Sequence, residues 1–350
     1  MTDTLPLIDV SPAAGGRPGL ARVGAEIGAA LEATGFAYVV GHGVDPRVIA
    51  AAFAASRAFH ALPLEEKLAI RQNAFHRGYM PFSSSTIVTS SVARVTKPNQ
   101  SESFMMMHEL DPGDPRLGQP LQGPNQWPAT LPGFRPAVLA YDRALSDLGD
   151  RLVRCIAVGL GLDAAHFDGA FAKPTTFVRM LHYPPHPADA PEDLYGSAPH
   201  TDYGFLTLVC QDGTGGLEVK RRAGGWIPAT PVEGAFVLNA ADILMRWTNN
   251  RLVSTPHRVV NRSPADRYSI AYFHDPSMDA VVAPLPGAAA QWPAVRFGDY
   301  LMERLDKNYA DREQQASCVL LRRPSSCVAG QRAGGARGGA SLRGESAALC

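Results

Sequence analysis

The 350-residue chain has little cysteine and no excess of charge of either sign. Its five cysteines follow no regular spacing and form no CxxC pair, and only Cys155 and Cys210 lie inside patterned sequence. This excludes a disulfide framework and gives no sign of a thiolate zinc site. With 33 basic and 33 acidic side chains the formal net charge is zero, so the chain lacks the global positive field expected of a nucleic-acid-binding protein.

The sequence also lacks a long apolar run. No uninterrupted apolar segment is long enough to cross a bilayer, and the opening MTDTLPLIDV is too acidic and too short of apolar residues for a signal peptide. We therefore expect a cytoplasmic protein, monomeric or homodimeric, that acts on a small molecule and has no nucleic-acid or membrane partner. What is present is an apolar share of 45%, which is ordinary for a globular protein and ample for a sizeable core.

The first third of the chain mixes helical and extended patterns. Residues 20–34 have helical spacing and stop at Gly35, a residue that commonly ends helices. Residues 36–40, FAYVV, predict a short buried strand, and the pattern after Pro46 predicts an amphipathic helix to about His60. The polar, Ser/Thr-rich residues 72–103 predict a long loop.

A long helix or a broken pair of helices is predicted over residues 134–162, and from Thr175 the apolar period becomes alternating. The predicted strands are Thr176–Tyr183, Gly204–Gln211, Gly216–Val219, Ala235–Leu238, Arg258–Asn261 and Tyr268–Phe273. Turn clusters separate these strands, which favours a β-sandwich or a closed double sheet. Residues 297–309 return to helical spacing.

Residues 318–350 consist mostly of Arg, Gly, Ala and Ser without any period. Such a segment buries too little apolar surface to offset the entropy of ordering it, so we expect disorder there. Its basic, glycine-rich character resembles an RNA-binding tail, but the interleaved aromatic residues of such tails are absent. An altered reading frame or a frayed terminus is the simpler interpretation and is favoured here.

The residues that carry chemistry begin with His200-Thr201-Asp202 and continue with His257. Side chains two residues apart on an extended strand point to the same side, so His200 and Asp202 can offer an imidazole and a carboxylate to one ion. His257 lies at the start of another predicted strand and supplies a third ligand. Two histidines and one carboxylate on one face of an octahedral ion are typical of oxygen-activating iron(II) sites.

Other histidines in the chain show that this spacing alone is weak evidence. His166-Phe167-Asp168 repeats the His-x-Asp pattern, but at the end of a predicted helix, where positions two apart diverge. We interpret this pair as a capping or surface feature. His42, His60 and His274 are interpreted as structural histidines.

A candidate anion site follows the distal histidine. Ten residues after His257, the predicted strand Arg267–Phe273 places Arg267 and Ser269 on one face. A guanidinium beside a hydroxyl is suited to bind a carboxylate through two hydrogen bonds. Next to a metal triad, this interpretation is favoured over that of an ordinary surface arginine.

These motifs together resemble the iron(II)/2-oxoglutarate-dependent dioxygenase superfamily, in the isopenicillin N synthase-like branch. The segments that carry the resemblance besides the triad and the Arg-x-Ser pair are GFAYVVGHG at 35–43, LPLEEK at 62–67 and HYPP at 182–185. It covers about residues 5–312 and implies a mainly β fold with flanking helices, a distorted jelly roll or double-stranded β-helix. It divides the chain into an N-terminal α/β region (1–125), a helical support (126–174), the jelly-roll core (175–278), a C-terminal helix (279–315) and a tail (316–350).

The resemblance also implies a role for each site residue. His200, Asp202 and His257 would bind Fe(II), and Arg267 and Ser269 would hold the distal carboxylate of 2-oxoglutarate. Further contacts to this co-substrate are expected from Tyr183 and Arg179, although Leu181-His182 departs from the Asn-Tyr found in many plant members. The expected activity consumes O2 and 2-oxoglutarate, releases succinate and CO2, and oxidises a small molecule, by default through hydroxylation.

The substrate cannot be read from the sequence, but candidate pocket residues can be named. They are Tyr203, Phe205 and Phe273, with Met80, Phe82 and Met105–Met107 as apolar positions that more often belong to a core.

Three other functions stay open. Arg179, Thr255–His257 and Ala271–Pro276 resemble the bacterial ethylene-forming enzyme, although Ser83–Thr86 replaces its acidic segment. An oxidase of the isopenicillin N synthase type would need no 2-oxoglutarate. A metal-binding regulator without catalytic activity is the alternative from another class.

Overall fold

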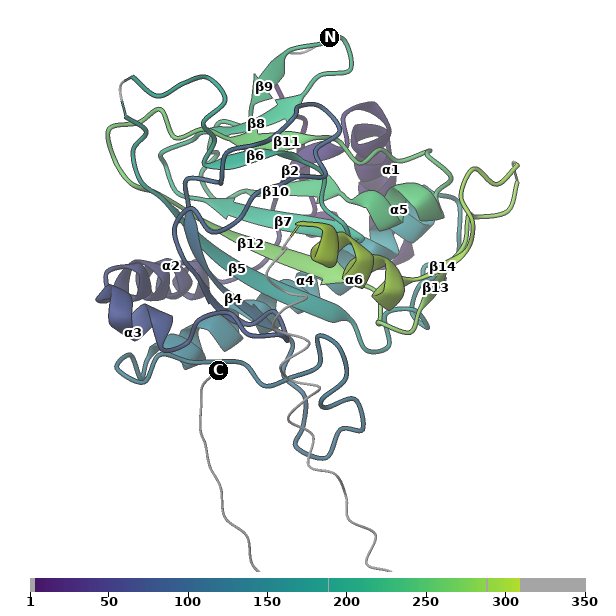
Figure 1. Ribbon diagram of the computed structural model, residues 1–350. Helices are drawn as coiled ribbons and strands as arrows, with labels where there is room; N and C mark the ends of the chain where they lie inside the picture. Colours follow the sequence, from purple (N-terminus) through teal and green to yellow (C-terminus); the bar gives the residue numbers. More distant parts are fainter. Residues whose placement is uncertain (1–3, 188, 288, 309–350) are drawn as a thin grey trace, which may run out of the picture.

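The computed structural model describes residues 4–187, 189–287 and 289–308 of the chain. Two β-sheets face each other, and helices cover the outer face of the larger one (Figure 1). The strands of the larger sheet, in spatial order, are β1 (Leu7–Asp9), β2 (Phe36–Val40), β10 (Phe236–Ala240), β7 (Leu206–Gln211), β12 (Arg267–Asp275), β5 (Thr175–Tyr183), β4 (Glu102–Met107) and β3 (Gly78–Met80). The smaller sheet has the order β6 (Ser197–His200), β11 (His257–Val259), β8 (Leu217–Lys220) and β9 (Trp226–Pro228).

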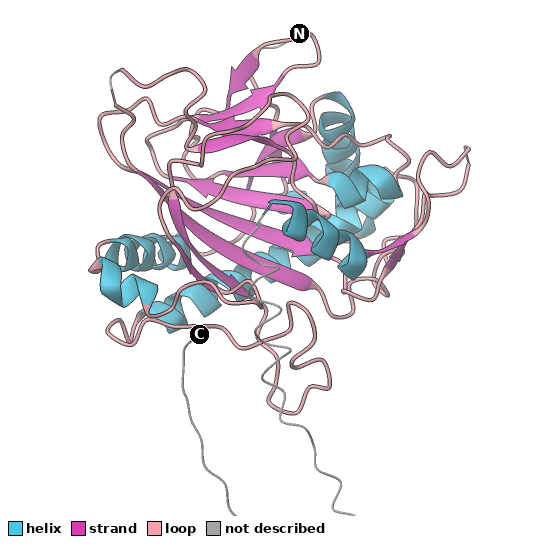
Figure 2. Cartoon of the chain, in the orientation of Figure 1, coloured by secondary structure: helices cyan, strands magenta, loops and turns pink. Residues whose placement is uncertain are grey.

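The helices lie on more than one side of the sheets, as the cyan ribbons of Figure 2 show. They are α1 (Arg17–Ala33), α2 (Pro46–His60), α3 (Leu64–Leu68), α4 (Phe134–Gly159), α5 (Asp242–Trp247) and α6 (Phe297–Asn308), with a 3-10 turn at Ser11–Gly15. A two-stranded ribbon of β13 (Val281–Val282) and β14 (Val295–Arg296) precedes α6. Within the described ranges, no helix combines the length and the apolar character of a membrane span.

The alternation along the central strands explains why both faces of the large sheet are buried. On β5, Val178 and Met180 join the core beneath α4, whereas Leu181 and Tyr183 join the smaller core between the sheets. Side chains on successive strand positions point to opposite faces, so one nine-residue strand serves both cores. The inter-sheet core therefore surrounds the part of the molecule where the smaller sheet carries its histidines.

Helix α1 ends as its sequence predicts. Thr34 follows the last helical residue, and Gly35 adopts φ +74°. A Cβ at Gly35 would lie 2.4 Å from the carbonyl oxygen of Val253, so there is no room for a side chain. The positive φ also disfavours any residue other than glycine. The chain can then turn directly into β2.

The predicted mainly β fold with flanking helices is confirmed, and every predicted strand is present with ends shifted by a few residues. The prediction of a long loop over residues 72–103 is wrong in part, because β3 and the start of β4 lie there. All six residues of β4 are buried, so the strand shows no alternation from which it could be recognised. Residues 279–315, expected to form a helix, hold the β13–β14 ribbon before α6 begins at Phe297. The tail predicted to be disordered lies outside the described residues.

Candidate metal centre and adjoining pocket

The smaller sheet brings the two candidate histidine ligands together. β6 ends at His200 and β11 begins at His257, and the antiparallel register pairs these two residues directly. Their ring centroids lie 4.3 Å apart. The side chain of Asp202 completes the group: its Oδ1 lies 3.6 Å from His200 Nε2 and 3.7 Å from His257 Nε2. Asp202 is not on the strand, as the spacing predicted, but in the turn that follows it.

Backbone carbonyls orient both imidazoles. The Nδ1 of His200 lies 2.7 Å from the carbonyl oxygen of Ala198, and the Nδ1 of His257 lies 3.3 Å from that of Thr255. A carbonyl can only accept, so each Nδ1 carries the proton and each Nε2 presents its lone pair to the site. Burial, and then the neighbouring His257, lower the pKa of His200 to about 4, which keeps its ring neutral at physiological pH.

The two oxygens of Asp202 have different surroundings. Oδ2 accepts hydrogen bonds from the Thr207 hydroxyl at 2.6 Å and the Asn239 amide at 2.9 Å. Burial alone would raise the pKa of Asp202, but the two histidines and these hydrogen bonds lower it overall, so the group is a carboxylate. Oδ1 is therefore left as an anionic ligand facing both Nε2 atoms.

This donor set fits a divalent transition metal. The ligand atoms of His200, Asp202 and His257 all lie within 4.8 Å of one another. Bonds of about 2.1 Å allow one ion to join donors up to about 4.2 Å apart, and the two separations from Oδ1 fall below that limit. Two imidazoles and one carboxylate suit iron(II) and leave coordination positions open.

Elsewhere in the described part of the chain, no second group of three such ligands gathers. His166 and Asp168 lie in a turn, where Asp168 pairs with Arg154 on the surface. The interpretation of this His-x-Asp pair as a surface feature agrees with its position.

Arg267 lies at the start of β12, and only 1% of its surface is exposed. Its guanidinium donates to the carbonyl of Gly215, to Ser269 Oγ at 3.1 Å and to Gln211 Oε1 at 3.1 Å. None of these acceptors is charged, and within the described ranges no carboxylate pairs with Arg267. A buried cation without a counter-ion is costly unless an anion binds beside it.

Tyr183 packs against the Arg267 guanidinium. The register pairs it with Arg267, and the guanidinium carbon lies 4.8 Å from the centre of the Tyr183 ring. Gln211 and Gly215 were not predicted as site residues. The only signal for them is their place on and after the strand that pairs with β12, which requires the sheet order to be known.

A cavity beside the triad has a volume of about 100 Å³. Tyr203 and Phe273 line it, as predicted, and so does Met105. Phe205, also predicted for the pocket, does not line this cavity: it lies just before β7, is fully buried and packs edge-on against Phe167 and Phe171 in the outer core.

Part of the cavity wall comes from segments that the sequence did not connect with the site. Leu301, Leu305 and Asn308 of α6 line it from one side, and the segment Ser85–Ile87 with Asn99 lines it from another. Arg179 lines the same cavity, four residues before Tyr183 on β5. Because Arg267 pairs with Tyr183, the backbone of Arg179 lies roughly 13 Å along the strand direction from that of Arg267.

Two family models match the chain. One, described as the N-terminal part of the non-haem dioxygenase in morphine synthesis, matches residues 5–130, and the other, the 2OG-Fe(II) oxygenase superfamily, matches residues 174–276.

Characterised relatives match over most of their length. The 2-oxoglutarate-Fe(II) type oxidoreductase hxnY of Emericella nidulans is 33% identical, covering 88% of this chain and 91% of the relative. A homoarginine-6-hydroxylase of Arabidopsis thaliana is also 33% identical, over 88% of this chain and 98% of its own. The crystal structure of a full-length Neurospora crassa protein in complex with alpha-KG is similar with a TM-score of 0.76 at 32% identity, covering 86% of this chain and 95% of that one.

Proposed function

We propose that His200, Asp202 and His257 bind the iron of this chain, which belongs to the 2OG-Fe(II) oxygenase superfamily. As a member of that superfamily, the chain is an oxidoreductase that uses Fe(II), 2-oxoglutarate and O2 on a small molecule. The observation that carries this proposal is the convergence of the two Nε2 atoms on Asp202 Oδ1. The hydrogen bonds to Ala198 and Thr207 support it, since they leave each ligand atom free toward one point.

The proposal places the distal carboxylate of 2-oxoglutarate on Arg267 and Ser269. The buried guanidinium lacks a carboxylate partner among the described residues, and Tyr183 lies against its face. A carboxylate accepting from Arg267 and Ser269 would neutralise this charge with strong hydrogen bonds.

Fe(II), when bound, supplies the site at which O2 reacts as 2-oxoglutarate is converted to succinate and CO2. The chain's own residues hold the reactants in place and exclude water. Asp202 stays ionised and fixed by Thr207 and Asn239, and Phe273 and Leu305 provide apolar walls beside the triad. Hydroxylation is the outcome we propose for the substrate.

The test begins without oxygen. Fe(II) and 2-oxoglutarate added to the protein should give a visible metal-to-ligand absorption band, and admitting O2 should then release succinate. Asp202→Ala and His257→Ala should lose both signals, whereas His166→Ala, which removes the histidine of the surface His-x-Asp pair, should keep them. Retained turnover in Asp202→Ala or His257→Ala would refute the ligand assignment.

A second arm tests the co-substrate site. Arg267→Ala should weaken 2-oxoglutarate binding by tenfold or more, because the buried ion pair between the guanidinium and the distal carboxylate is lost. Each factor of ten in affinity corresponds to about 1.4 kcal/mol of binding free energy. An unchanged affinity for 2-oxoglutarate would remove Arg267 from the site.

The alternatives gain no support. The relatives are named as 2-oxoglutarate-dependent oxidoreductases and hydroxylases, which disfavours both an oxidase that works without 2-oxoglutarate and a regulator without activity. The resemblance to the ethylene-forming enzyme finds no counterpart in the relatives named above. The oligomeric state, the cytoplasmic location and the lack of nucleic-acid or membrane partners stay predictions.

A further inference from the structure

The cavity beside the triad contains an arginine that the co-substrate site does not use. We propose that Arg179 binds a carboxylate of the molecule being oxidised, so that the substrate is a compact organic acid. This inference rests on the proposed function, which makes the cavity the place where the substrate lies. It replaces the expectation that Arg179 contacts 2-oxoglutarate.

The contacts of Arg179 leave its charge unbalanced. Its Nε donates to Ser103 Oγ at 3.1 Å, and one terminal nitrogen lies 3.4 Å from the sulfur of Met80. Neither partner is charged, and in the part of the chain that the structure describes no carboxylate lies within ion-pair distance of this guanidinium. The other terminal nitrogen finds no acceptor among the same residues, so Arg179 can still donate to a ligand.

The carboxylates that line the cavity are engaged elsewhere. Asp202 faces the two histidines and is held by Thr207. Asp275 lies four residues beyond Ala271, the register partner of Arg179, and accepts from the backbone N–H of Phe205 at 2.7 Å. Burial raises the pKa of Asp275 to about 8, so at neutral pH it is mostly uncharged.

Charge balance then points to a monoanion. When iron and 2-oxoglutarate are bound, the charges of the metal, Asp202, the two carboxylates of the co-substrate and Arg267 cancel. The cation of Arg179 remains, in the same cavity that His200 and Asp202 line. Arg179 is half-buried, and one carboxylate on the substrate would neutralise its charge.

The strand geometry separates this position from the co-substrate site. Arg179 pairs with Ala271 in the middle of β12, whereas Tyr183 pairs with Arg267 at its start. Four residues of strand correspond to roughly 13 Å, so the two guanidinium groups can hold carboxylates of two different molecules.

The neighbours of Arg179 indicate the rest of the substrate. Phe177 and Phe273 lie edge to face with ring centroids 6.0 Å apart, and Met105, Leu301 and Leu305 complete an apolar wall. With a cavity volume of about 100 Å³, the fitting class is a small acid with an apolar or aromatic body.

Binding measured without turnover tests this inference. The full chain, loaded with Fe(II) and saturating 2-oxoglutarate in the absence of O2, is titrated calorimetrically with benzoate, phenylacetate, 3-phenylpropionate and hexanoate, and with the primary amide of each. At least one acid should bind about tenfold or more tightly than its amide, which has the same shape but no charge. If no acid exceeds its amide, the inference fails.

Variants of Arg179 test whether this residue causes the tighter binding of an acid than of its amide. Arg179→Gln should abolish the difference between acid and amide, and Arg179→Lys should keep part of it. Arg47→Gln, a change of an exposed arginine on α2, should leave the difference intact. A preference that survives in Arg179→Gln would overturn the assignment.

Titration of 2-oxoglutarate shows whether Arg179 binds a carboxylate of the substrate or one of the co-substrate. Arg179→Gln should change the affinity for 2-oxoglutarate by less than about twofold, while Arg267→Gln should lower it by about tenfold or more. Equal losses in both variants would assign Arg179 to the co-substrate instead. Failure of the proposed function is recognised separately, since wild-type protein would then release no succinate, and the comparison of acid with amide can still be made on metal-free protein.

Discussion

Asp202 offers only one of its oxygens to the metal position, because Thr207 and Asn239 hold the other. Thr207→Val keeps the shape of the threonine but removes the hydroxyl that donates at 2.6 Å. The carboxylate can then rotate, and loss of such an orienting hydrogen bond costs about 10–100-fold in metal affinity. Fe(II) affinity should fall by that factor when it is measured by anaerobic titration.

Thr176→Val is the matched control for this change. Thr176 is also a buried threonine on a strand of the large sheet, but its hydroxyl donates to Asp142, away from the triad. Metal affinity should stay at the wild-type value in this variant. Equal losses in both variants would mean that Thr207 acts through general stability.

Gly204 lies in the same turn as Asp202 and leaves no room for a side chain. A Cβ there would lie 1.7 Å from Asp275 Oδ1. Gly204→Ala must displace the turn or the Asp275 side chain, and overpacking of this kind costs about 1–3 kcal/mol. Denaturant unfolding should show that loss together with weaker metal binding, whereas Gly213→Ala, with nothing within 4 Å of the added carbon, should be nearly neutral.

At this scale the sequence indicated the metal ligands but not the residues that orient them. His200, Asp202 and His257 are recognisable as candidate ligands because few residue types bind iron, although Asp202 lies after the strand and not on it. Thr207 and Asn239 are ordinary polar residues in strands, and only the pairing of β7 with β10 brings them to the same carboxylate.

Helix α6 and the segment around Thr89 are joined by one side chain at the edge of the cavity. Asn308 accepts from the backbone N–H of Thr89 at 3.2 Å and its hydroxyl at 3.0 Å, and donates to the Tyr203 hydroxyl. Asn308→Ala should loosen this segment, since it removes the hydrogen bonds that hold Thr89 to α6. Trypsin should then cleave at Arg94 several times faster, and the KM for the substrate should rise more than kcat falls.

Glu303→Ala provides the comparison on the same helix. Glu303 is exposed, and among the described residues its ion pair is with Lys307 one turn away. Its removal should leave the cleavage rate at Arg94 unchanged. If Asn308→Ala is cleaved no faster than Glu303→Ala, the contact does not restrain the segment.

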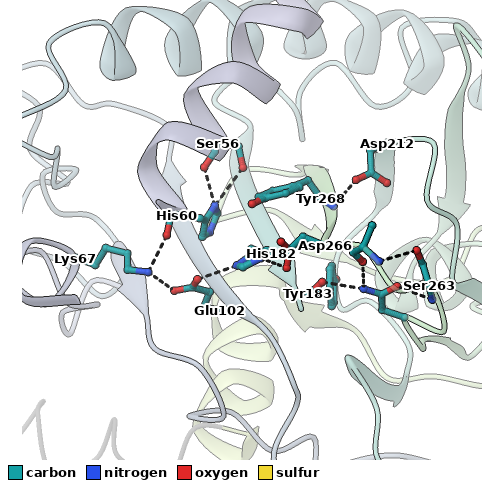
Figure 3. A network of polar contacts seen from close by, with 12 residues as sticks. Ser56, His60, Lys67, Glu102, His182, Tyr183, Asp212, Ser263, Asp266 and Tyr268 are labelled. Carbon is teal, nitrogen blue, oxygen red and sulfur yellow. Dashed lines mark hydrogen bonds and ion pairs between the residues drawn. The ribbon is translucent and has the colours of Figure 1, made fainter. Parts of the chain in front are cut away.

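His182 connects the strands β4, β5 and β12 near the proposed co-substrate site (Figure 3). Its ring nitrogens lie 2.8 Å from Glu102 Oε1 and 3.0 Å from Asp266 Oδ1, and its ring stacks on Tyr268 at 4.8 Å. Burial alone would lower the pKa of His182, but the hydrogen bonds with Glu102 and Asp266 raise it overall. Lys67 also pairs with Glu102, and the pKa of nearby His60 is lowered by burial to about 4, so His60 is neutral.

A raised pKa in the folded state fixes the sign of the pH dependence. The stability contributed by the His182 cation is fully present below its ordinary value of 6.5 and is lost as the pH rises through the higher folded value. The difference in unfolding free energy between wild type and His182→Gln should therefore shrink as the pH rises above 6.5. His186→Gln should show the opposite slope, because burial lowers the pKa of His186. A flat difference for His182→Gln would contradict a charged bridge.

Elements were predictable where one face of a segment differs from the other. Helix α2 was predicted at its observed bounds because it is amphipathic and begins at a proline. Strand β4 was missed because both of its faces are buried, and its Met105–Met107 run carries no period. Helix α6 was predicted, but its place over the cavity depends on tertiary contacts.

In the whole molecule, the N-terminal region and the core form one sheet. β1 and β2 lie beside β10, and β3 and β4 lie beside β5, so strands from residues 7–107 flank both sides of the core strands. Pairings between residues about two hundred positions apart, such as Phe36 with Asn239, leave no local trace in the sequence. The predicted boundary near residue 125 therefore separates stretches of sequence that share one hydrophobic core.

The proposed metal and co-substrate sites join the two sheets, so we expect metal to stabilise the whole molecule. The triad comes from the smaller sheet and its following turn, whereas Arg267 comes from the larger sheet. A ligand that binds only the folded chain adds about 2.7 kcal/mol at one hundred times its Kd. Saturating Fe(II) with 2-oxoglutarate, without O2, should thus raise the Tm by roughly 5 °C.

Removal of metal should reverse this stabilisation. EDTA should return the Tm to that of the apoprotein, and 2-oxoglutarate alone should raise it less than it does with Fe(II), because the co-substrate then loses its bonds to the metal. Asp202→Ala should show no rise with Fe(II), while His166→Ala should respond as wild type does. A rise in Asp202→Ala equal to that of wild type would show that the metal stabilises the chain from another position, since the carboxylate that draws both histidines to one point would be absent.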